Sequence, residues 1–82
     1  MDQHTYQIDA IWDPVAGVWV ATSDEAPGLA TEADSLEELT RKLRVMVPEL
    51  LEANSVSHGD TASEISFEVT GRRRELVVKT AC

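Results

Sequence analysis

The chain has 82 residues, of which 43% are hydrophobic and 27% are charged, and its formal net charge is -8. This length and composition favour one folded domain spanning residues 1–82, and they exclude a chain that is disordered throughout. The acidic balance makes DNA or RNA an unfavourable partner, because contacts with phosphates supply most of the affinity of nucleic-acid-binding proteins.

The negative charge is concentrated in the N-terminal half of the chain. No Lys or Arg precedes Arg41, whereas nine acids do: Asp2, Asp9, Asp13, Asp24, Glu25, Glu32, Asp34, Glu37 and Glu38. Such a surface either keeps a small domain soluble or attracts a basic partner. We take Asp24, Glu25 and Glu32 as candidate partner-binding residues. They border the turn at residues 27–28, which would present them to a partner.

Cys82 is the only cysteine of the chain, so a disulfide bond within the chain is excluded. The sequence contains neither a secretory signal nor an apolar run of about 18 residues. We therefore expect a soluble, cytoplasmic protein that does not contact a membrane.

Alternating hydrophobicity at the start of the chain predicts a β-hairpin. Within residues 5–13, the side chains that fall on one face are those of Tyr6, Ile8, Ala10 and Trp12. Residues 13–17 contain Pro and Gly and predict a short turn, and residues 18–23 predict the second strand. Pro27 interrupts the pattern because it cannot donate to a β-ladder, and residues 29–33 predict a short third strand.

One long helix is expected next. Ser35 and Glu38 have the spacing of a capping box, which places the start of the helix at Ser35. Apolar residues at three- and four-residue steps form one face of this helix: Leu36, Leu39, Leu43, Met46, Val47 and Leu50. We expect a kink at Pro48, which removes one backbone hydrogen bond. The helix should end near Asn54.

A final strand completes the expected fold. Residues 55–63 predict a polar connector, and residues 64–70 alternate again, with Ile65, Phe67 and Val69 facing inward. Residues 76–79 either extend this strand or add another. The resulting fold class is α+β in the order β-β-β-α-β, and a helix between strands allows the last strand to pair in parallel with the first.

Three stretches taken together resemble the HicB-like antitoxin superfamily. They are Val-Trp-Val-Ala at residues 18–21, Ala-Pro-Gly-Leu at residues 26–29, and Thr-Glu-Ala-Asp-Ser-Leu-Glu-Glu-Leu at residues 31–39. Members have a strand that ends in an acidic turn with Pro and Gly, followed by a Ser- or Thr-capped helix with paired glutamates. The resemblance covers residues 6–54 and is greatest to a stand-alone, uncharacterised branch of domains of unknown function.

The resemblance implies a fold and a partner. The fold is a partial ribonuclease-H-like sheet of three antiparallel strands, a helix and a fourth strand. HicB antitoxins neutralise a small basic ribonuclease toxin by covering it. Many also carry a C-terminal DNA-binding segment, and this chain departs from that pattern because residues 64–82 do not resemble one. We therefore expect a protein partner and no binding to DNA.

The residues that usually carry catalysis do not form a recognisable motif. His4 and His58 are expected in irregular segments with incidental roles, and no cysteine–histidine pair, phosphate-binding loop or zinc-ligand spacing occurs. We expect no enzyme, no metal and no cofactor. The ribonuclease-H-like resemblance leaves one alternative, a metal-dependent nuclease in which Asp9, Glu32 and Glu68 approach one another.

The run Arg72, Arg73 and Arg74 is the one basic cluster. It either discourages pairing between sheets at a solvated edge or contacts a phosphate or an acidic partner.

The two tryptophans lie on either side of the first turn. The alternation places Trp12 with the core residues and Trp19 on the face that a single helix leaves open. An exposed Trp19 beside Ile11 and Ala21 would form an apolar patch, so Trp19 is a fourth candidate partner-binding residue and we expect a homodimer or larger assembly.

Two classes of function follow from the sequence. The first is a non-catalytic protein-binding module of the HicB antitoxin type that sequesters a basic, ribonuclease toxin-like partner. The second is an oligomeric structural or regulatory domain without a toxin partner.

Overall fold

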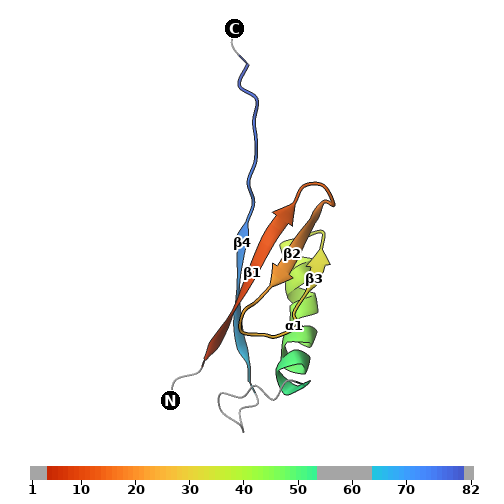
Figure 1. Cartoon of the computed structure of the whole chain (residues 1–82), viewed down its shortest axis with the longest axis vertical. Coiled ribbons are helices and arrows are strands. Elements are labelled where there is room, and N and C mark those ends of the chain that lie inside the picture. The colour runs from red at the N-terminus through yellow and green to blue at the C-terminus, as the bar shows by residue number, and fades with distance from the viewer. Residues whose placement is uncertain (1–3, 54–63, 81–82) are drawn as a thin grey trace.

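The computed structural model describes residues 4–53 and 64–80, and it shows one helix packed on one face of a four-stranded sheet (Figure 1). The elements in chain order are β1 (Thr5–Asp13), β2 (Val18–Thr22), β3 (Thr31–Ala33), α1 (Leu36–Ala53) and β4 (Ser66–Arg72). The predicted α+β class and the order β-β-β-α-β are confirmed. The expected connector at residues 55–63, His58 and Cys82 lie outside the described residues.

The strands lie in the order β3-β2-β1-β4. β1 pairs with β2, and β2 with β3, in antiparallel fashion, whereas β4 pairs in parallel with β1 from Thr5 opposite Ser66 to Ile11 opposite Arg72. The parallel crossover that a helix between strands allows is therefore present. It places β4 at one edge of the sheet and β3 at the other.

Asp13 and Gly17 build the turn between β1 and β2. The Asp13 carboxylate oxygen Oδ1 accepts hydrogen bonds from the backbone N–H groups of Val15 and Ala16, at 3.0 and 3.2 Å. The Gly17 N–H donates to the Asp13 carbonyl at 2.8 Å, and Gly17 has φ = 71°, a conformation that glycine adopts at little cost. The turn is thus fixed by hydrogen bonds within residues 13–17.

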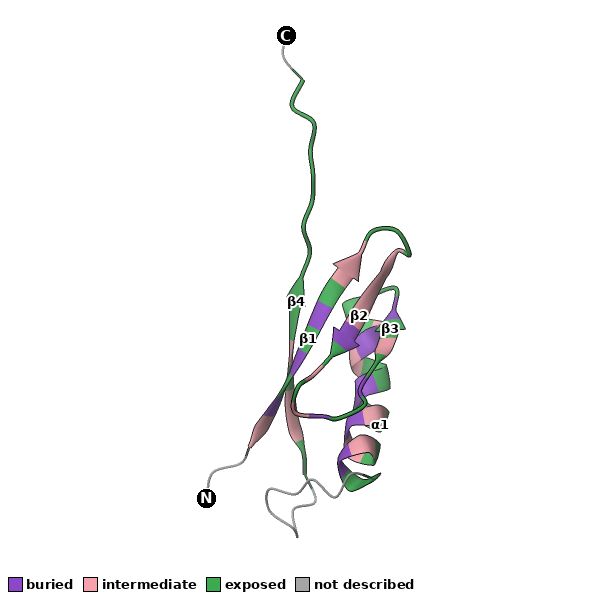
Figure 2. Cartoon of the chain, in the orientation of Figure 1, coloured by how far each residue is buried: buried purple, intermediate pink, exposed green. Residues whose placement is uncertain are grey.

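The core lies between α1 and the face of the sheet that α1 covers, here called the covered face. From β1, the side chains of Tyr6, Ile8 and Ala10 are buried there, as the alternation predicts. Figure 2 shows buried positions along β1 and along α1. Phe67 and Val69 of β4 are half-buried against the same cluster, again as predicted.

The buried stripe of α1 consists of residues at four-residue steps: Leu39, Leu43, Val47 and Leu51. The sequence pattern predicts the first three correctly but omits Leu51. Leu36 is exposed, and Leu50 is only half-buried. The Glu38 N–H donates to the Ser35 hydroxyl at 3.0 Å, which confirms the helix start. The helix continues without interruption through Pro48.

Three expected boundaries differ from the structure. β3 begins at Thr31, two residues later than expected, because Leu29 closes a turn onto the Ala26 carbonyl at 3.0 Å and Gly28 has φ = 84°. β4 begins at Ser66, so Ile65 precedes the strand and is 42% exposed instead of facing inward. Residues 73–80 belong to no strand and leave the domain as an extended segment, here called the arm (Figure 1).

We predict that Leu43→Ala lowers the free energy of unfolding by about 2–5 kcal/mol, because Leu43 is fully buried at the centre of the stripe. Urea unfolding followed by circular dichroism measures the change. Val45→Ala, at an exposed position of the same helix, is the control and should change the free energy by no more than about 0.5 kcal/mol. A loss below about 1 kcal/mol at Leu43 would contradict the assigned buried face.

Candidate partner-binding surface

The face of the sheet opposite α1, here called the open face, has no covering element among the described residues (Figure 1). The register aligns Val20 of β2 with Ile11 of β1, both on the open face, and continues this row to Glu32 on one side and Arg72 on the other. Ile11 is 53% exposed. The open face therefore has an apolar centre with an acid at the β3 edge and a base at the β4 edge.

Further acids lie on this face on one side of that row, toward the N-terminal end of β1. Asp9 lies between Thr22 and Thr70, and Glu68 lies beside Gln7. Asp9, Glu32 and Glu68 share the open face, but no two of them are paired directly in the register. Within residues 4–53 and 64–80, no group of three or more His, Cys, Asp or Glu side chains could hold a metal ion. The arrangement is that of an acidic surface with an apolar centre.

Glu25 has a structural role that the sequence did not indicate. Its Oε1 accepts a hydrogen bond from the Gln7 backbone N–H at 2.7 Å, and its Oε2 contacts His4 Nε2 at 2.9 Å. Next to it, the Ser23 hydroxyl donates to the Gln7 carbonyl at 2.6 Å and accepts from the Glu25 N–H at 3.1 Å. Two side chains thus take the place of a strand beside Gln7, where β2 has already ended.

The other two candidate acids are exposed. Asp24 lies in the loop after β2, and the Glu32 side chain lies on the open face. The backbone of Glu32 is fixed from the other side, because Lys42 of α1 donates to its carbonyl oxygen at 2.6 Å. Asp24 and Glu32 are therefore available to a partner, whereas Glu25 is engaged within the domain.

The expected position of Trp19 is wrong. Trp19 pairs with Trp12 in the β1–β2 register, and their rings meet edge to face with centroids 5.5 Å apart. Trp19 is half-buried against the core, and Ala21, expected beside it on the open face, is fully buried on the covered face. Of the three residues of the expected apolar patch, only Ile11 lies on the open face.

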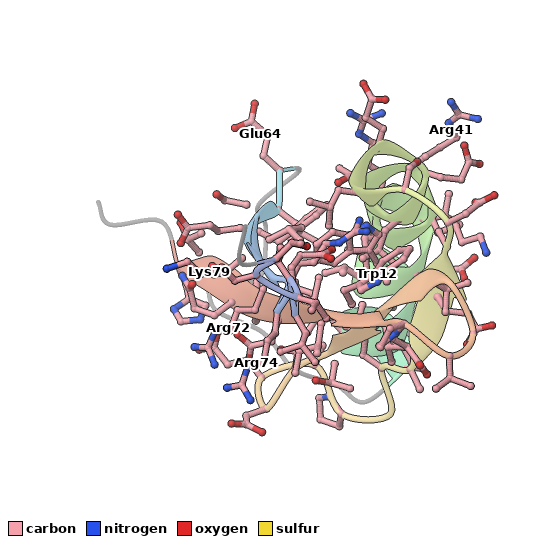
Figure 3. The ribbon with its side chains drawn as sticks, turned by 90° about the horizontal axis from the view of Figure 1, so that it is seen from above. Trp12, Arg41, Glu64, Arg72, Arg74 and Lys79 are labelled. Carbon is pink, nitrogen blue, oxygen red and sulfur yellow. The ribbon has the colours of Figure 1, made fainter. Side chains whose placement is uncertain are left out.

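The arginines at the end of β4 have different surroundings. Arg72 is the last residue of the strand, and Arg72 and Arg74 project to the same side of the chain (Figure 3). The Arg73 guanidinium lies 4.1 Å from the centre of the Trp12 ring and forms an ion pair with Glu75. This cation–π contact joins the base of the arm to β1, and it was not foreseen because sequence spacing does not bring residues 12 and 73 together.

A groove of about 810 Å³ lies beside this contact. It is lined by Ile11, Trp12, Pro14, Arg72, Arg73, Arg74 and Leu76. Its walls come from the ends of β1 and β4, the first turn and the base of the arm. Three arginines line it, so the groove is basic, whereas the open face is mainly acidic.

The comparisons with known proteins agree with this fold. The sequence profile of a domain of unknown function, DUF1902, matches residues 5–79. The crystal structure of a hypothetical protein from the extremely thermophilic bacterium Thermus thermophilus is similar to this chain, with 51% sequence identity and a TM-score of 0.77. The match covers 92% of this chain and all of that one. No curated protein matches the sequence. The helix in the described residues is not long and apolar enough to cross a membrane.

We predict that Glu25→Ala lowers the free energy of unfolding by about 1–2 kcal/mol, because the Gln7 N–H loses a charged acceptor at a partly exposed site. Thermal or urea unfolding measures the change. Asp24→Ala removes the same charge from the adjacent, exposed position and should stay within about 0.5 kcal/mol. Equal changes in the free energy of unfolding for the two substitutions would show that the hydrogen bond with Gln7 does not stabilise the domain beyond the effect of the charge.

Proposed function

Since the chain belongs to the DUF1902 family of domains of unknown function, we propose that it is a non-catalytic protein-binding module of the HicB antitoxin type, which sequesters a basic, ribonuclease toxin-like partner in the cytoplasm. The observation that carries this proposal is the open face, where exposed acids adjoin an uncovered apolar centre at Ile11 and Val20. Acids attract and orient a basic protein, and an apolar centre supplies contact area once it has arrived.

The arrangement of the acids supports this role. Asp9, Glu32 and Glu68 come from three different strands and share one face. Asp24 adds an exposed acid in the loop that follows β2. A surface that spans the width of the sheet suits the covering of a small protein better than the recognition of a short peptide.

The sequence resemblance supports the class of partner. The motifs that resemble HicB antitoxins lie in β2, in the loop that follows it, and in the segment from β3 to the first turns of α1. These elements form the β3 side of the domain, next to Glu32. The proposed contact surface therefore adjoins the part of the chain that carries the resemblance.

A second role is an oligomeric structural or regulatory domain without a toxin partner. The observation that favours it is the arm, in which Leu76, Val77 and Val78 are exposed. Exposed consecutive apolar side chains are typical of a segment that associates with another chain.

The first role is tested with the partner captured from the source cell by the tagged chain. We predict that Asp24→Lys combined with Glu32→Lys slows association with this partner by about tenfold or more, because charge complementarity acts mainly on the rate of encounter. Glu25 is left unchanged because its replacement would also disturb the fold. Stopped-flow kinetics at increasing salt should show a falling association rate for the unmodified chain and a weaker salt dependence for the variant.

The control is Glu49→Lys combined with Glu52→Lys, which makes the same change in net charge at two exposed positions of α1. It should retain most of the association rate. If both double variants slow association equally, only net charge matters and the open face is not the contact surface. Capture of no basic protein, or metal-dependent RNA cleavage by the purified chain, would contradict the proposal itself.

A further inference from the structure

The arm combines two properties that a segment of an isolated domain rarely has. It continues the direction of β4 away from the domain (Figures 1 and 2), and the molecule is accordingly 63 Å long but only 25 and 19 Å in its other dimensions. Leu76, Val77 and Val78 within it are 93%, 82% and 84% exposed. Transfer of Leu and Val side chains out of water is favourable, so this segment is suited to burial against another surface.

The arm lacks the residues that favour a tight turn back onto its own domain. Residues 72–80 contain no Gly, Pro, Asn or Asp, the residues that commonly form tight turns. Gly71 is part of β4 and is not among the glycines with positive φ. The base of the arm is held in the direction of β4 by the stacking of Arg73 on Trp12. The surface that buries the arm is therefore expected to belong to another molecule.

β4 provides such a surface on a second copy of the chain. It is the edge strand next to β1, and no described strand pairs with its outer side. Phe67 and Val69 remain half-buried along it, and Gly71 lies beneath the side chains of Leu36 and Trp19. The edge thus offers unpaired backbone groups together with apolar surface, the combination that an added β-strand requires.

We propose that two copies of this chain exchange arms, each arm pairing as an antiparallel strand with the outer edge of β4 in the other copy. The lengths match, because the arm has eight residues and β4 has seven. A twofold axis between the copies buries both arms and covers both β4 edges, so the assembly closes as a dimer.

The distribution of charge favours a second copy as the occupant of this edge. The arm together with Arg72, the last residue of β4, contains four of the seven Lys and Arg residues of the chain and only one of its 15 acids. The arm is therefore basic and the remainder of the domain is acidic, and the receiving strand itself carries Glu68 on the open face. Each copy thus supplies both an apolar, basic strand and an acidic edge that can receive it.

The inference rests on the second of the two proposed roles and is independent of the first. It is tested on the purified full chain with no other protein present. We expect sedimentation velocity and light scattering to show a dimer at micromolar concentration. Leu76→Asp combined with Val78→Asp should give a monomer with an unchanged circular dichroism spectrum, because both side chains are exposed in a single copy. Val15→Asp is the control, since Val15 is 95% exposed but lies in the first turn; it should remain dimeric.

Hydrogen exchange distinguishes arm exchange from dimerisation through another surface. The backbone amides of residues 75–79 should be protected in the unmodified chain and should exchange at the rate of an unstructured peptide in the Leu76→Asp, Val78→Asp variant. A monomeric unmodified chain, a dimer that survives this double substitution, or a dimer with unprotected arm amides would each overturn the proposal. None of these results bears on whether the open face binds a basic partner, which the charge variants test separately.

Discussion

The packing of large side chains over a row of small ones decides which face of the sheet is covered. Ala21, Ala10 and Gly71 lie side by side across β2, β1 and β4, all on the covered face. A Cβ atom at Gly71 would lie 3.2 Å from Leu36 Cδ1 and 3.3 Å from Trp19 Cζ3, so these two side chains use the space that the small residues leave. With Trp19 held there, α1 can lie over Ile8 and bury its own stripe. The acids of the opposite face are consequently left in solvent.

The same packing separates the molecule into surfaces of opposite character. The open face carries acids from three strands beside Ile11 and Val20, whereas the end of β4 and the arm carry most of the basic residues. Arg72, which is paired with Ile11, lies where these surfaces meet. A basic partner protein and the basic arm of a second copy would therefore be attracted by the same acidic domain, although the proposed contacts, the open face and the β4 edge, are different.

Local patterns predicted the elements well, and they failed where contacts between distant residues decide the outcome. Alternation and capping identified the strands, the helix and the buried positions Leu39 and Leu43, because each depends on neighbours within a few residues. Trp19 was placed on the wrong face because its position depends on the register between β1 and β2, which pairs it with Trp12. Alternation within each strand, considered separately, does not reveal this register. Glu25 was taken as a surface acid because the sequence does not show that Gln7, 18 residues away, needs an acceptor.

The pairing of Thr5 with Ser66 also has a consequence for the order in which the chain becomes structured. The two residues are far apart in sequence, and their hydroxyl groups lie 3.1 Å apart in the folded domain. During synthesis β1, β2, β3 and α1 emerge first. One edge of β1 therefore stays unpaired until β4 has left the ribosome. Contacts of this sequence separation form slowly, and an unpaired strand edge is prone to aggregation while it persists. The nascent chain is therefore most vulnerable after its helix has formed and before its last strand arrives.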